Sequence, residues 1–152
     1  FTKLDWNRRP PGQLDLRRAI ADQAGLTPEH VALGAGPEAV LAAVIAAWAL
    51  RATVVYPVPT SPAWARVALA MGATPVAVMS KADFSLPVEQ LVAVAKQQQA
   101  ALVLLGSPQD PTGALVSRDE VLTIVRETDA LVLVDETLAA YAGFSVAAAA
   151  AE

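Results

Sequence analysis

Four short runs of consecutive apolar residues recur along the chain, and they predict buried strands. The runs cover residues 53–57, 74–79, 101–106 and 130–136. Their apolar residues follow one another instead of alternating with polar ones, which is typical of strands buried on both faces of a parallel sheet. A weaker apolar run at residues 30–34 predicts a fifth strand.

Segments with helical spacing of apolar residues lie between these runs. They cover residues 14–24, 38–50, 62–71, 87–98 and 118–128. Ser117 and Glu120 form an S-x-x-E capping box at the start of the last segment. The alternation of strands and helices predicts right-handed crossovers and an α/β fold, with α/β/α layers around a mostly parallel sheet.

The helical segment at residues 38–50 is apolar nearly all round, which fits burial against something larger. No Gly/Ser linker divides the chain, and we therefore expect a single domain over residues 14–152. Residues 1–13 form a short N-terminal segment that ends in the boundary-like sequence RRPPG.

Composition narrows the functional classes. Apolar residues make up 55% of the chain and the net charge is −4, which favours a globular fold and argues against nucleic-acid binding. The absence of cysteine excludes disulfides and thiolate metal sites and fits a cytoplasmic protein. The apolar runs are too short or too interrupted to span a bilayer, so we expect no membrane insertion. No cluster of metal ligands is found in the sequence.

The residues that could take part in binding or catalysis lie at the ends of the predicted strands. In an open parallel sheet, ligands bind beyond the carboxyl ends of the strands. Four such ends are informative: GAGPE, PVPTS, GSPQDPTG and DET. Because these segments meet at one edge of the sheet, the sequence predicts one shared site rather than several separate ones.

Two of these segments each allow two interpretations. Gly34 and Gly36 precede a helix and could hold an anion, but Pro37 lacks an N–H, and the glycines could equally serve the turn alone. Asp135 ends an apolar strand with Glu136 beside it, and a carboxylate there needs a cation or a donor. The alternative is that Asp135 caps the following turn.

The order of the motifs resembles the large domain of class I/II aminotransferases, which are pyridoxal phosphate (PLP) enzymes of fold type I. The resemblance runs from about residue 14 to residue 143 and is nearest to the histidinol-phosphate aminotransferase group, with threonine-phosphate decarboxylase as a near neighbour. KLDWN, at residues 3–7, is similar to the family's opening segment. The segments that carry the resemblance are LRRAIADQAGLTPEHVALGAG, YPVPTSPAW, GATPVAVM, GSPQDPTGALVSRDEV and LVLVDET.

This resemblance implies PLP as the ancestral cofactor and assigns four positions to it. Gly36 and Glu38 stand where the family holds the cofactor's phosphate. Asp110 stands at the Asn of the N-P-T-G motif, whose amide donates to the phenolate oxygen. Asp135 stands at the aspartate that pairs with the pyridinium nitrogen and keeps the ring an electron sink.

Several positions depart from the family pattern. Ser61 replaces the aromatic residue that stacks on the ring, although Trp64 follows one helical turn later. Leu138 stands at the position of a tyrosine, Pro37 replaces a phosphate-binding residue, and Asp110 places a carboxylate against the phenolate. These departures predict that the chain binds PLP weakly or not at all.

The lysines are Lys3, Lys81 and Lys96, and none follows Asp135, where the family's Schiff-base lysine is expected. The 152 residues therefore contain no expected catalytic residue, and we predict that they transfer no amino group to a 2-oxo acid. The chain is either a fragment of an aminotransferase or a non-catalytic pseudo-enzyme that serves as a structural or partner-binding subunit. Unpaired sheet edges and uncovered apolar faces predict a homodimer or a larger complex.

Overall fold

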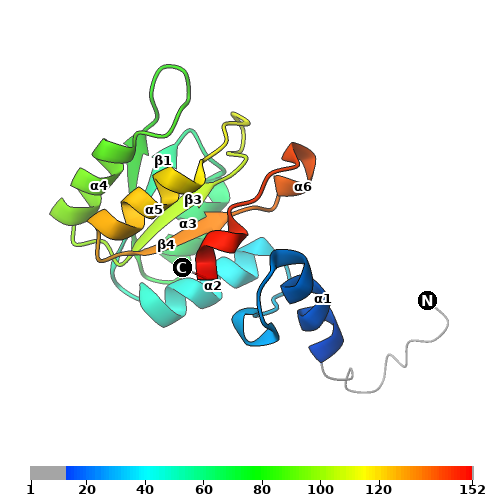
Figure 1. Ribbon diagram of the computed structural model, residues 1–152. Helices are drawn as coiled ribbons and strands as arrows, with labels where there is room; N and C mark the ends of the chain where they lie inside the picture. Colours follow the sequence, from blue (N-terminus) through cyan, green and yellow to red (C-terminus); the bar gives the residue numbers. More distant parts are fainter. Residues whose placement is uncertain (1–12, 152) are drawn as a thin grey trace.

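A four-stranded parallel sheet forms the centre of the computed structural model, which describes residues 13–151 (Figure 1). The strands lie side by side in the order β2-β1-β3-β4. They are β1 (Thr53–Val58), β2 (Thr74–Met79), β3 (Leu102–Gly106) and β4 (Leu131–Asp135). The four predicted strands are thus confirmed to within one or two residues at their ends.

Helices cover both faces of this sheet. They are α1 (Leu14–Ala24), α2 (Pro37–Trp48), α3 (Pro62–Ala70), α4 (Val88–Gln97), α5 (Arg118–Glu127) and α6 (Ala139–Ala142), with 3₁₀ helices at Pro28–His30 and Ala147–Ala151. Buried residues of α2 and α3 pack on one face, and those of α4 and α5 pack on the other. The three-layer α/β fold is therefore confirmed.

Strand β3 shows why the apolar runs are continuous. Leu102 and Leu104 belong to the cluster with α2 and α3, whereas Val103 and Leu105 belong to the cluster with α4 and α5. All four side chains are at most 1% exposed. A strand with helices on both faces buries every successive side chain, so no polar alternation can develop.

The prediction of a fifth strand at residues 30–34 is wrong. The chain forms the 3₁₀ helix Pro28–His30 there, with N–H groups of His30 and Val31 donating to the carbonyls of Thr27 and Pro28. Pro28 favours this turn because its ring fixes φ near the helical value. The apolar residues that follow have no regular structure, and none of the four described strands pairs with them.

The helical segment at residues 38–50 is not covered on all sides by the described residues, and its expected burial against something larger stays a prediction. Leu41 and Ile45 face the core, but Trp48 is 63% exposed.

The predicted capping box at the start of α5 is present. The N–H of Glu120 donates to Ser117 Oγ at 3.3 Å, and the N–H of Ser117 donates to Glu120 Oε2 at 2.8 Å.

Helix α1 lies beside the layered core rather than on the sheet (Figure 1). Its Arg17 guanidinium donates to the carbonyl of Pro28 through Nε at 3.0 Å, which ties α1 to the 3₁₀ turn. The proposed N-terminal segment, with its KLDWN sequence, lies almost wholly outside the described residues, so the division at residue 13 stays a prediction. Within residues 13–151, no helix has the length and apolar character needed to cross a membrane.

Candidate functional site

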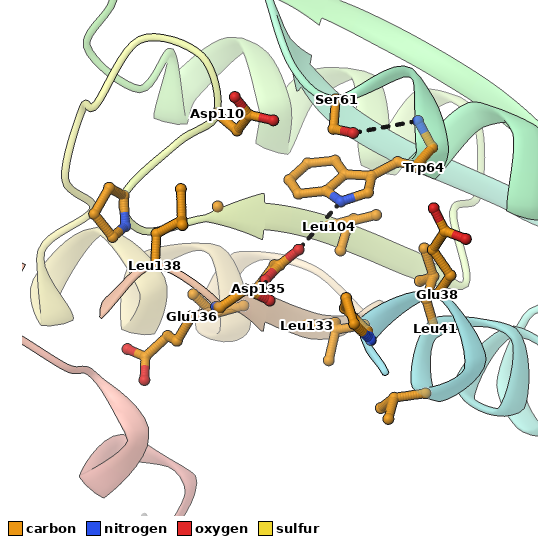
Figure 2. A pocket seen from close by; sticks show the side chains of 17 residues that line it. Glu38, Leu41, Ser61, Trp64, Leu104, Asp110, Leu133, Asp135, Glu136 and Leu138 are labelled. Atoms are coloured by element: carbon orange, nitrogen blue, oxygen red, sulfur yellow. Dashed lines mark hydrogen bonds between the residues drawn. The ribbon is translucent and has the colours of Figure 1, made fainter. Parts of the chain in front are cut away.

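A cavity of about 440 Å³ lies at the carboxyl ends of β3 and β4 (Figure 2). Its walls come from the starts of α2 and α3, the turn after β3 and the segment after β4. Three of the four predicted site residues line it: Glu38, Asp110 and Asp135. Gly36 precedes the lining residue Pro37 and is the N-cap of α2. The parallel sheet thus brings three of these chain segments to one hollow, and the start of α2 completes it.

The carboxylate of Asp135 accepts three hydrogen bonds. Its Oδ1 accepts from the N–H of Thr137 at 3.0 Å and from Thr137 Oγ1 at 2.6 Å. Its Oδ2 accepts from Trp64 Nε1 at 3.3 Å. The carboxylate therefore caps the turn after β4, which was one of the two interpretations of this residue. Its pairing with a ring nitrogen stays a prediction.

Trp64 forms a wall of the cavity and is itself almost fully buried, with 6% of its surface exposed. Figure 2 shows its indole lying between Ser61 and Asp135, close to Leu104. Tyr56 packs edge-on to this ring, with the centroids 6.4 Å apart and the planes at 83°. The sequence placed Trp64 near the site but gave no sign of the contact with Asp135, which spans 71 residues of chain.

The start of α2 is built as a tight turn. Gly36 has φ of 95°, a left-handed conformation that favours glycine, and Pro37 occupies the first helical position. Because Pro37 has no N–H, one of the donors that could face an anion at a helix start is missing. Glu38 adds a negative charge there, and its Oε1 lies 3.8 Å from an Arg66 nitrogen on the exposed surface.

The turn after β3 is held by Gln109, a residue that sequence reasoning missed. Its side chain is 6% exposed, and its Nε2 donates to the carbonyl of Pro59 at 2.9 Å. Its backbone N–H donates to Ala114 O, and its carbonyl accepts from Gly113 N. Gln109 thus joins the two loops that follow β1 and β3. A polar residue inside a proline-rich turn next to a buried strand was the signal that could have identified it.

The Gln109→Leu variant should lower the melting temperature by roughly 3–8 °C, because the partly buried carbonyl of Pro59 loses its donor at a cost of about 1–3 kcal/mol. Leucine is similar in size, so little packing is lost. Thermal unfolding followed by circular dichroism measures the change. Gln97→Leu, at an exposed position of α4, is the matched control. A melting temperature equal to that of the control would contradict the bridging role of Gln109.

The charges that line the cavity are all negative. Glu38, Asp110, Asp135 and Glu136 contribute carboxylates, and no lysine, arginine or histidine among the described residues is part of the lining. Glu136 Oε2 accepts a hydrogen bond from Ser145 Oγ at 2.6 Å. Apolar side chains, including Leu41, Leu104, Leu133 and Leu138, form much of the remaining wall. The cavity is therefore suited to cationic or neutral groups and disfavours anions.

The described lysines lie elsewhere. Lys96 is on α4, and its Nζ contacts Glu127 Oε2 at 3.1 Å on the exposed surface. Lys81 follows β2 and is exposed. Neither lines the cavity.

Comparisons with known proteins place these features in a family. The family model described as aminotransferase class I and II matches residues 6–152. Histidinol-phosphate aminotransferases from Chlorobium phaeovibrioides and Prosthecochloris aestuarii are 33% and 34% identical, each over 95% of this chain and 40% of the relative. The chain thus spans about two fifths of the length of these curated relatives.

Solved structures show the same similarity. Histidinol-phosphate aminotransferase from Sinorhizobium meliloti, in complex with pyridoxal-5'-phosphate, is 25% identical, with a TM-score of 0.77 over 86% of this chain and 36% of that one. N-Succinyldiaminopimelate aminotransferase from Mycobacterium tuberculosis is 27% identical, with a TM-score of 0.74 over 86% of this chain and 38% of that one.

Proposed function

Because the chain belongs to the class I and II aminotransferases, we propose that its 152 residues form the ring-binding half of an ancestral PLP site that no longer supports amino transfer by itself. The cavity at the ends of β3 and β4 is the part of the chain that carries this proposal. Pyridoxal phosphate is the ancestral cofactor, since the family depends on it and the Sinorhizobium meliloti relative is in complex with it.

The observation that carries the proposal is the charge of the cavity. PLP brings a phosphate and a phenolate, both anionic, and needs donors or cations for them. Here the corresponding positions are Glu38 and Asp110, and Pro37 offers no N–H. Like charges repel, and no lysine, arginine or histidine among the described residues lines the cavity to offset them. Only Asp135 suits the cofactor, as an acceptor for a protonated ring nitrogen. As a whole, these residues do not fit PLP.

The positions of the lysines support the same conclusion. A covalent link to the cofactor's aldehyde requires an amine within bonding reach. Lys81 and Lys96 are the lysines of the described residues, and neither lines the cavity. We therefore infer that the described residues contribute no group that acts covalently on an amino acid.

A titration of the purified chain with PLP tests the proposal. We expect no long-wavelength absorbance band of a lysine-bound cofactor and no saturable binding up to millimolar PLP. Reduction with borohydride followed by mass spectrometry should add no cofactor mass. A stable absorbance band together with a single labelled lysine would overturn the proposal.

A second function follows if these residues are part of a longer protein. The identity of 33–34% to histidinol-phosphate aminotransferases and the location of Asp135 at the end of β4 favour amino transfer to a 2-oxo acid by such a protein. Expression together with any further coding sequence, followed by the same titration, separates the two functions. A lysine-bound cofactor in the longer chain alone would support the second.

We further infer that the chain acts in the cytoplasm within a homodimer or larger complex, as a structural or partner-binding subunit if it is non-catalytic. The lack of cysteine supports the compartment. Exposed apolar side chains on α2 and α6, such as Trp48 at 63% and Tyr141 at 89%, support an association.

A further inference from the structure

We propose that Trp64 is a positioning residue, which together with Thr137 fixes the Asp135 carboxylate so that one acceptor position remains toward the cavity. The inference rests on the proposed role of Asp135 as the ionic group of the ancestral ring site. It extends that role, because it states how many donors a ligand can offer to this carboxylate and which residue sets their direction.

The donors that already bind the Asp135 carboxylate limit how many donors a ligand can add. An ionised carboxylate has about four acceptor positions, two on each oxygen. Thr137 fills both positions of Oδ1 through its N–H and its hydroxyl, at 3.0 and 2.6 Å. Trp64 Nε1 fills one position of Oδ2 at 3.3 Å. One position on Oδ2 is left, so an entering ligand meets a single acceptor rather than a freely rotating carboxylate.

The indole of Trp64 is held in a fixed position by its neighbours. Trp64 is 6% exposed and packs edge-on to Tyr56, so its ring has little freedom to turn. Gly106 provides room for the ring, since a Cβ on that residue would lie 3.3 Å from Trp64 Cη2. Ser61 Oγ caps α3 by accepting from the N–H of Ala63 at 3.3 Å, which anchors the helix that carries Trp64.

A purely structural tryptophan would fill the same space without responding to the charge of Asp135. The indole N–H distinguishes the two roles, because its proton resonance moves when its acceptor gains or loses charge. The sequence has three tryptophans, Trp6, Trp48 and Trp64, so three indole signals are expected in a nitrogen–proton correlation spectrum. The Trp64→Phe variant identifies which of them belongs to Trp64.

The test compares the Trp64 indole resonance of the folded wild-type chain with that of the Asp135→Asn variant at neutral pH. We expect the wild-type resonance to lie downfield, because its acceptor is a carboxylate, and the resonance of the variant to move upfield. An unchanged Trp64 resonance in Asp135→Asn would overturn the proposal.

Two variants at Thr137 complete the test and do not require a substitution of the buried tryptophan. Thr137→Ser keeps the hydroxyl donor to Oδ1, and the Trp64 resonance should keep its position. Thr137→Val removes that donor while keeping the shape, and the carboxylate should turn, so that the resonance shifts. Identical spectra for the two variants would contradict the joint positioning of the Asp135 carboxylate by Trp64 and Thr137. No PLP is present, so the outcome is independent of the PLP titration.

Discussion

The Gly106→Val variant should melt roughly 10 °C below the wild-type chain, a loss of about 3–5 kcal/mol in the free energy of unfolding. A Cβ at this position would lie 2.5 Å from Gln109 Oε1, 3.2 Å from Gln109 Cα and 3.3 Å from Trp64 Cη2. The neighbouring Cα is backbone and cannot move aside cheaply. We therefore expect loss of the bridge from Gln109 to Pro59 in addition to strain in β3.

Gly113→Ala is the matched control for this experiment. Gly113 lies in the same turn and has φ of 74°, but a Cβ there would meet nothing within 4 Å. It should therefore cost only the backbone strain of a left-handed residue, about 1–2 kcal/mol. Thermal and denaturant unfolding of both variants separate crowding from backbone conformation. Equal stability of the two would show that the space beside Gly106 can be remodelled and that the turn is not tightly built.

The double variant Glu38→Gln/Asp110→Asn should bind PLP saturably at roughly 10 μM, on the order of 100-fold below the millimolar range in which the wild-type chain does not saturate. On the proposed binding mode, each substitution removes a negative charge beside an anionic group of the cofactor. We expect about a tenfold gain for each, which is about 1.4 kcal/mol in the free energy of binding. The substitution of Glu38 also removes its exposed contact with Arg66, whose Nη2 lies 3.8 Å from Glu38 Oε1.

The matched control changes the net charge by the same amount at a distance from the cavity. Asp22→Asn/Glu89→Gln alters exposed acids on α1 and α4, neither of which lines the cavity. Tryptophan fluorescence quenching and calorimetry measure the affinity of each protein for PLP. A gain that is equal in both double variants would reflect overall charge alone. No gain in Glu38→Gln/Asp110→Asn would show that local carboxylates do not limit binding.

The strands could be predicted from the sequence because a strand that is buried on both faces has apolar residues at consecutive positions. Leu102 to Leu105 are buried in succession, and the sequence records this as an uninterrupted apolar run. The short run at residues 30–34 has the same pattern but forms no strand. Strand formation needs a partner that supplies hydrogen bonds, and the sequence pattern does not contain that information.

The candidate site could be predicted in its location but not in its contacts. Parallel strands bring their carboxyl ends to one edge, which placed Asp110 and Asp135 at one cavity. Glu38 lies there at the start of α2, although the strand predicted before it does not form. The hydrogen bond between Trp64 and Asp135 depends on where α3 settles against β4, which no local pattern encodes. The same holds for the buried Gln109, whose partner Pro59 lies 50 residues away in the chain.

The hydrogen bonds of the turn after β3 have an evolutionary consequence. They run through Gln109, the Gly113 N–H and the Ser107 hydroxyl, which accepts from Val116 N at 3.1 Å. Among the described residues, none of them uses the side chain of Asp110. The hydrogen bonds that shape the turn therefore do not depend on whether residue 110 is an amide or an acid. A single exchange between the two at this position, in either direction, can change the charge of the cavity without rebuilding the scaffold.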